Sequence, residues 1–362
     1  MPDGKSGFAA VSGGAKKKRT RKKTKGGPKR KFVVDTKTKE ELSDTEWDLT
    51  EEDTIEHVFM RPDKRRRKGY KIASYGNTGS GKSRFALSTV RLNPKDVQED
   101  IELWDLPGEI HDHCTETVLA GFESGAIVRG TPIIFIGTEE SVEDCIWGED
   151  QWDMVAEHVD HDILYTEVYR KYKGGPNRGE MDTIASLKAF NRAWSILLRD
   201  AEDGKFDGGG TIVIDSATSI LKWSNDYLRR KIHGKTEEDK EQGIPARYWM
   251  WRNWKMESMM LALRSMIPNT ITTWKVGKDK EGDFTDQADW HKGTSDHHSN
   301  TIFEHPLHDR DLFTAKVEKC RRARRVRMKT IPWPSATVFA AMLVRGVEYD
   351  AVKKLKPKEP RA

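Results

Sequence analysis

The feature that most constrains this chain is the pattern Gly-x-x-x-x-Gly-Lys-Ser at Gly76–Ser83. An apolar-leaning run over 70–75 leads into the pattern, and a helical pattern over 85–90 follows it. Glycines allow a loop of this kind to fold so that backbone N–H groups point inward at phosphate oxygens. The following helix adds the positive end of its dipole at the same place. The pattern therefore predicts a phosphate-binding loop between a strand and a helix, which is the setting that the motif requires.

The residues of this loop have distinct expected roles toward a nucleoside triphosphate. We expect Lys82 to reach the β- and γ-phosphates, and the Ser83 hydroxyl to bind Mg²⁺. The alternative, a glycine- and serine-rich turn followed by a surface lysine, is disfavoured by the strand and the helix on either side. The predicted nucleotide-binding residues are those of the whole loop: Gly76, Asn77, Thr78, Gly79, Ser80, Gly81, Lys82 and Ser83.

Two further apolar runs end in carboxylates. Thr211–Asp215 has the character of a buried strand, and Asp215 at its tip is expected to hold Mg²⁺ through water. The alternative is an aspartate that only caps the next helix. Thr131–Glu140 is a second such run, and it ends in Glu139 and Glu140. One of these glutamates is expected to orient the attacking water, whereas the alternative is two solvated acids at a helix start.

The composition limits the class of protein and its compartment. Of the 362 residues, 36% are hydrophobic and 33% are charged, so part of the chain is expected to lie outside any packed core. Three scattered cysteines cannot form a disulfide framework, and they fit a reducing, cytoplasmic environment. No apolar run is long enough to cross a bilayer, so no membrane association is expected.

Charge and the alternation of strands with helices predict the domain organisation. Residues 1–57 are expected to form a disordered extension, which is basic over 1–31 and then acidic. From 58 to 345, strand patterns alternate with helix patterns, which predicts an α/β domain whose mostly parallel sheet has helices on both faces. Within this domain the polar stretch 277–310 is expected to be a loop insertion, and 346–362 follows as a charged tail.

Some segments give weaker patterns. Ile101–Asp105 is a possible strand, and 312–318 with 325–331 resembles a closing strand pair. The long helix over 245–266 is rich in Trp and Met, which is more typical of a buried or inter-subunit helix than of a DNA-contacting one. The histidines lack the paired spacing of a structural zinc site, so zinc is not predicted.

Four segments together make the chain resemble the RecA-like ATPases, and more closely the small phage and archaeal RecA-like proteins linked to single-strand recombination. They are Gly76–Ser83, Phe135–Glu139, Ile212–Ser216 and Lys319–Arg321, and the resemblance covers roughly residues 68–335. It implies a RecA-like P-loop NTPase core. The chain departs from the family in a longer stretch after the loop helix, in its enlarged polar loop, and in DNA-binding loops that residue type does not match.

The resemblance also implies roles for single residues. Glu139 matches the glutamate that activates water in this family, and Thr273 or Lys275 falls where a polar residue senses the γ-phosphate. Lys319 and Arg321 match a Lys-x-Arg pair that one subunit contributes to its neighbour's nucleotide, which implies a homo-oligomer. The expected catalytic residues are Glu139, Lys82, Lys319 and Arg321.

The sequence thus predicts an enzyme that hydrolyses ATP with Mg²⁺ and acts on single-stranded DNA in recombination, annealing or replication; the phage resemblance leaves a viral origin open. A helicase or DNA-packaging motor of the same fold is one alternative, and a small-molecule phosphotransferase is another. The candidate DNA contacts are the arm 1–31, the basic clusters 64–68 and 321–327, and the loop 277–300 with Trp290 as a base-stacking side chain. The arm is equally well read as a solvated tail. For Trp290 the favoured alternative is a side chain docked on its own surface.

Overall fold

The computed structural model of this chain describes residues 69–102, 108–139, 162–233, 246–278, 284–288, 298–306, 313–332 and 334–344. The chain divides into two units, Met1–Pro62 and Asp63–Ala362, and every described residue belongs to the second. The predictions for the N-terminal extension, the cluster 64–68, Glu140, Trp290 and the C-terminal tail fall outside the described residues.

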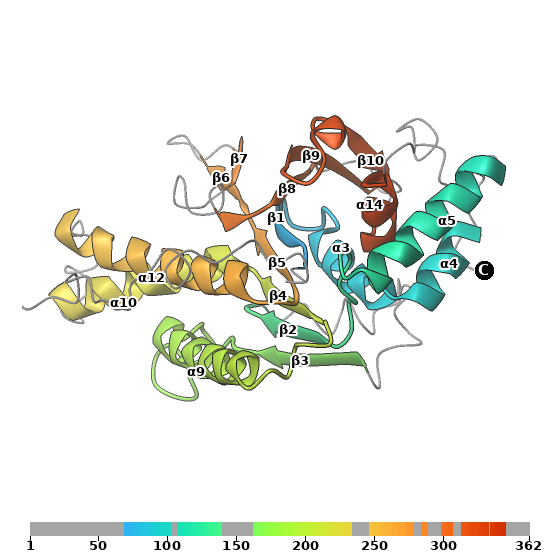
Figure 1. The fold of residues 1–362 in the computed structure, drawn as a ribbon. Helices are drawn as coiled ribbons and strands as arrows, with labels where there is room; N and C mark the ends of the chain where they lie inside the picture. The colour runs from blue at the N-terminus through green and yellow to red at the C-terminus, as the bar shows by residue number, and fades with distance from the viewer. Residues whose placement is uncertain are drawn as a thin grey trace, which may run out of the picture. The chain divides into compact units, whose positions relative to one another are not determined.

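An eight-stranded sheet organises the described part of the chain, in the order β10-β9-β8-β1-β5-β4-β2-β3 (Figure 1). From β8 to β3 every neighbouring pair is parallel, whereas β9 is antiparallel to both of its neighbours. The prediction of an α/β fold with a mostly parallel sheet is confirmed. The strands are β1 (Lys71–Gly76), β2 (Ile133–Gly137), β3 (Ile163–Glu167), β4 (Thr211–Asp215), β5 (Asn269–Trp274), β8 (Thr301–His305), β9 (Thr314–Cys320) and β10 (Thr330–Pro332), and a separate hairpin holds β6 (Val276–Lys278) and β7 (Phe284–Ala288).

Two groups of helices cover the two faces of the sheet. One face packs Phe135 and Val213 against α3, α4, α5 and α14, and the other packs Ile136 and Ile212 against α9, α10 and α12. Because successive strand residues alternate between two apolar cores, β2 and the central residues of β4 are apolar at successive positions. The helices are α3 (Lys82–Leu87), α4 (Pro94–Glu102), α5 (Gly108–Glu123), α9 (Thr183–Glu202), α10 (Ala217–His233), α12 (Ala246–Ser265) and α14 (Ala336–Met342). None of these described helices combines the length and the apolar character that a membrane span requires.

Ile101 lies in a helix, so the possible strand over Ile101–Asp105 is wrong for its first residues. α4 begins after Asn93, whose side-chain oxygen accepts the Asp96 N–H at 3.0 Å and so caps the first turn. Val97 and Ile101, four residues apart, are both fully buried on one side of this helix. The cap and the apolar spacing together outweigh the local strand propensity of the segment.

The polar stretch 277–310 is not a simple loop. Its residues 301–305 form β8, which lies between β1 and β9 inside the sheet. Ile302 and Phe303 are buried on opposite faces, one in each core. The expected closing pair is also present, as β9 and β10, with a short 3₁₀ turn over Arg324–Val326 between them. The strand β8 therefore connects the domain's last segments to the loop-bearing strand β1.

Candidate functional site

The loop Gly76–Ser83 joins the end of β1 to the start of α3, in the strand–loop–helix arrangement that the sequence predicts. Gly79 and Gly81 have φ angles of +80° and +87°, in the left-handed region that favours glycine. A Cβ atom on Gly81 would also lie 2.8 Å from the Phe313 ring, so a side chain there would require Phe313 to shift. The loop has the tight turn and the bare backbone that a phosphate cradle needs.

The Lys82 side chain folds back over this loop, and the residue is only 8% exposed. Its Nζ donates to the Asn77 carbonyl at 2.6 Å, to the Gly76 carbonyl at 3.1 Å and to the Ser80 hydroxyl at 3.3 Å. Burial lowers the pKa of Lys82, and the negative charge of Asp215 opposes that shift. A phosphate bound in the loop would stabilise the charged form of Lys82, whose ammonium group already lies over the loop.

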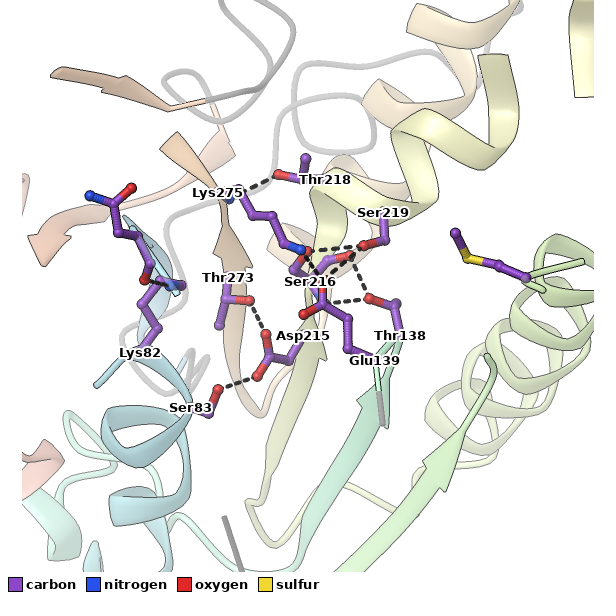
Figure 2. Close-up of polar contacts among 12 residues, drawn as sticks. Lys82, Ser83, Thr138, Glu139, Asp215, Ser216, Thr218, Ser219, Thr273 and Lys275 are labelled. Carbon is purple, nitrogen blue, oxygen red and sulfur yellow. Dashed lines mark hydrogen bonds and ion pairs between the residues drawn. The ribbon is translucent and has the colours of Figure 1, made fainter. Parts of the chain in front are cut away.

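Asp215 ends β4 and contacts the loop helix across the intervening strand β5. One of its carboxylate oxygens accepts the Ser83 hydroxyl, and the other accepts the Thr273 hydroxyl (Figure 2). The two side chains expected to hold Mg²⁺ are thus in direct contact, although they are 132 positions apart in the sequence. Hydroxyl and carboxylate oxygens are ligands that hard cations prefer, so this donor set fits Mg²⁺.

Glu139 follows β2 at the same edge of the sheet. Its carboxylate forms an ion pair with the Lys275 ammonium and accepts the Ser219 hydroxyl at 3.4 Å (Figure 2). The Thr138 hydroxyl accepts the Ser216 N–H at 2.8 Å, and this bond joins the chain after β2 to the chain after β4. This bond fixes the position of Glu139 just beyond β2, and β2 lies directly beside β4, the strand that ends in Asp215.

The two residues expected to sense a γ-phosphate have different contacts. Thr273 donates its hydroxyl to Asp215 and so supports the expected metal ligand. Lys275 pairs with Glu139, and its positive charge also contributes to the lowered pKa of Lys82, behind the larger effect of burial. Lys275 is therefore the cation that acts on both the loop lysine and the glutamate.

A cavity of about 610 Å³ opens beside Glu139 and Lys275. The start of α9 forms part of its wall, where Asp182 caps the helix by accepting the N–H groups of Ile184 and Ala185 at 3.1 and 3.0 Å. A volume of this size lies within the range of small-molecule pockets. Its lining residues include Tyr169, Thr183, Ser219, Lys222, Asn225 and Arg229.

Sequence reasoning did not identify His305 or Phe313, which both lie against the loop. A Cβ atom on Gly76 would lie 2.3 Å from the His305 carbonyl oxygen, so β8 packs directly on the loop. Burial lowers the pKa of His305 to about 3, and the positive charge of Lys82 acts in the same direction. The Arg84 guanidinium lies 5.1 Å from the centroid of the Phe313 ring. His305 belongs to a polar stretch with no strand pattern, and the strand pattern over 312–318 does not show that Phe313 lies beside the loop.

Lys319 and Arg321 do not approach the loop of their own chain. Lys319 pairs with Ile302 on β8, and the Arg321 N–H donates to the Asn300 carbonyl at 2.9 Å. Because β9 is antiparallel to β8, Arg321 lies level with the start of β1, at the opposite end from the loop. The expected role of this pair toward a neighbouring subunit's nucleotide stays a prediction.

Comparisons with known proteins assign no family to this chain. No protein-family model matches it, and no curated protein matches it significantly. The sequence motifs and the geometry of the site therefore carry the functional assignment.

Proposed function

We propose that this chain binds ATP with Mg²⁺ and hydrolyses it on a RecA-like P-loop NTPase core. The observation that carries the proposal is that Lys82, Asp215 and Glu139 come together at one edge of the sheet, close enough for both carboxylates to act on the pKa of the lysine. They come from three separate segments, which follow or end β1, β4 and β2. Sheets of this kind bind ligands at the carboxyl ends of their strands, and phosphoryl transfer uses these residue types.

The loop and its lysine bind the triphosphate in this proposal. Backbone N–H groups of 76–83 contact phosphate oxygens, and the Lys82 ammonium exchanges its carbonyl partners for phosphate. Because this ammonium is buried, an anionic partner favours its charged form. Ser83 and Asp215 hold Mg²⁺, which when bound neutralises charge on the phosphates. Thr273 keeps the Asp215 carboxylate in position.

Glu139 orients the attacking water and accepts its proton. In the structure this carboxylate is paired with Lys275, whose charge also acts on the loop lysine, Lys82. A γ-phosphate bound near Lys82 is therefore within electrostatic reach of Lys275. We propose that Lys275 turns to the phosphate and so frees Glu139 to bind water.

Single-stranded DNA and further copies of the chain are the proposed partners, with action in recombination, annealing or replication. Exposed arginines around the 3₁₀ turn form a basic cluster that suits a phosphate backbone. These are Arg321, Arg322, Arg324, Arg325 and Arg327. By the resemblance to RecA-like ATPases, Lys319 and Arg321 act on the nucleotide of the neighbouring copy.

The cavity beside Glu139 supports a second candidate, a small-molecule phosphotransferase. An acceptor bound in about 610 Å³ would lie next to the carboxylate, which would then remove a proton from the acceptor instead of from water. In that case turnover of ATP requires the acceptor and does not respond to DNA.

Steady-state ATP hydrolysis by the full chain, with and without single-stranded DNA, tests the proposal. Lys82→Ala is expected to abolish ATP binding and turnover, whereas Lys95→Ala, which removes an exposed lysine, leaves both unchanged. Asp215→Asn is expected to weaken Mg²⁺ binding, so that turnover requires a higher Mg²⁺ concentration. A Lys82→Ala chain that hydrolysed ATP at the full rate would overturn the proposal. Turnover that appears only with an added metabolite favours the phosphotransferase.

A further inference from the structure

A row of aromatic rings and ammonium groups runs along α10 and α12, which lie side by side (Figure 1). The Lys231 Nζ lies 6.0 Å from the Tyr227 ring centroid, and the Tyr227 ring stacks on that of Trp251 with centroids 6.0 Å apart. The Lys255 Nζ lies 5.9 Å from the Trp251 ring centroid and 5.2 Å from that of Trp254. We call these five residues the cation–aromatic row.

The two sides of α12 differ in burial. Met256, Met259 and Met260 are buried in the core shared with α10, as expected for a helix rich in methionine. Trp254 is 59% exposed and Trp251 is 38% exposed, although tryptophan is a residue that folding buries for most of its surface. Burial therefore accounts for these three methionines, whereas the two tryptophans remain at the surface.

The cations in the row distinguish nucleic acid from protein as its occupant. The cores of protein–protein interfaces are depleted in lysine, because burying its ammonium is costly. Sites for single-stranded nucleic acid combine cations that contact the backbone with aromatic faces on which bases stack. Lys231 and Lys255 are both exposed and rest on the ring faces, so the row offers both kinds of group within one strip.

We propose that the cation–aromatic row binds single-stranded nucleic acid. Bases stack on Trp254 and Trp251, and Lys255 and Lys231 contact the phosphates beside them. The inference rests on the partner class of the proposed function but not on ATP hydrolysis, since stacking requires no nucleotide in the loop.

The row is connected to the candidate site through α10. This helix begins two residues after Asp215, and its Ser219 hydroxyl contacts the Glu139 carboxylate. A nucleic-acid strand bound to the row would therefore contact α10, the helix whose Ser219 hydroxyl contacts Glu139.

Fluorescence anisotropy with the full chain and no nucleotide tests the proposal. The probes are a labelled oligothymidylate and an abasic strand of the same length, which keeps the phosphates and lacks the bases. Trp254→Ala is expected to weaken oligothymidylate binding about 5- to 150-fold and to leave abasic binding unchanged. Met250→Ala and Leu261→Ala are matched controls, because both side chains are exposed on α12 outside the row. Lys255→Gln is expected to weaken the binding of both probes and to make that binding less sensitive to salt concentration.

The abasic reference also accounts for the basic arm 1–31, which would contact phosphates in both probes. Trp254→Phe, which keeps a ring, is expected to restore most of the binding. No binding of oligothymidylate, or equal losses in the Met250 and Leu261 variants, would overturn the proposal. A Trp254→Ala chain with normal DNA binding but altered sedimentation would show that the face joins protein copies instead. Normal DNA binding by a Lys82→Ala chain would show that the row acts independently of the ATP site. The DNA-binding proposal and the ATPase proposal can then fail separately.

Discussion

The Lys275 ammonium and the Glu139 carboxylate form an ion pair at the edge of the sheet, although one follows β5 and the other follows β2. Their side chains are 38% and 37% exposed, and ion pairs that water can reach contribute little to folding stability. The pair instead neutralises the carboxylate that we propose as the group that activates water. Release of this carboxylate is then a requirement for turnover.

Replacing the cation tests that requirement. Lys275→Met is expected to reduce ATP turnover by at least tenfold, because the γ-phosphate then loses the second cation that we propose for it beside Lys82, while the melting temperature stays within about 2 °C of the parent. Lys95→Met is the matched control, since Lys95 forms an exposed ion pair with Glu99 at 3.8 Å. Rates measured over a range of ATP concentrations separate binding from turnover. Unchanged kcat and KM in the Lys275 variant would contradict this role.

Replacing the glutamate separates binding from chemistry. Glu139→Gln keeps the size of the side chain and removes the base, so we expect turnover to fall by about 10²- to 10⁴-fold while ATP binding persists. Equilibrium binding of a fluorescent ATP analogue and phosphate release measure the two properties. Glu202→Gln, an exposed change at the end of α9, is the control. Loss of binding equal to the loss of turnover would contradict a role limited to the chemical step.

A buried glycine far from the loop gives a stability test. A Cβ atom on Gly130 would lie 1.7 Å from the Thr89 carbonyl oxygen, and the Gly130 carbonyl accepts the Thr211 hydroxyl at 2.7 Å. Gly130→Ala is therefore expected to lower the free energy of unfolding by about 1–3 kcal/mol or more. Gly108→Ala, where no atom lies within 4 Å of the new Cβ, should not destabilise the chain. Urea unfolding followed by circular dichroism measures both, and equal midpoints would contradict the packing described here.

The buried histidine predicts a pH dependence of stability. The pKa of His305 is lowered to about 3 in the fold, against 6.5 as the ordinary value, so between these limits the unfolded chain binds a proton that the folded chain does not. Above pH 6.5 the imidazole is neutral in both states, so it makes stability no more dependent on pH. Below it, this residue lowers stability by up to about 1.4 kcal/mol per pH unit as pH falls.

Urea midpoints at several pH values measure this loss of stability at low pH. His305→Gln is expected to flatten the fall between pH 6.5 and 4, whereas His111→Gln, at a partly exposed helix position, keeps the slope of the parent. If the His305 variant cannot be purified as a folded chain, the proton uptake of the parent on unfolding at pH 5 gives the same quantity. An unchanged slope, or the absence of proton uptake, would argue against a neutral buried imidazole.

The parts of the fold that the sequence predicts correctly are those with a local signal. The glycine-rich loop and the apolar runs that became β2 and β4 each carry their pattern within about ten residues, and the structure has strands at both runs. β8 has no such signal, because a five-residue strand with only Ile302 and Phe303 buried in the two cores lies among polar residues. Its place is decided by pairing with β1, more than two hundred positions earlier.

The site shows the same division. The residue types at Ser83, Asp215 and Glu139 are evident from the motifs, but their contacts depend on the order of the strands. Because β5 lies between β1 and β4, Thr273 and Lys275 reach Asp215 and Glu139. From the sequence alone, Thr273 and Lys275 are equally suitable as the residue that senses the γ-phosphate. The strand order distinguishes them, because it places Thr273 on Asp215 and Lys275 on Glu139.

The reversed direction of β9 has a consequence for any assembly of this chain. It carries Arg321 to one edge of the sheet, while the loop Gly76–Ser83 lies at the other. If this arginine serves a neighbour's nucleotide, the contact joins unlike surfaces of two copies. In a twofold dimer, both such contacts would have to lie within one interface, so both ends of the sheet would have to face the same partner. A head-to-tail contact instead leaves one surface of every copy open to the next, and the assembly would close into a ring or continue as a helical array.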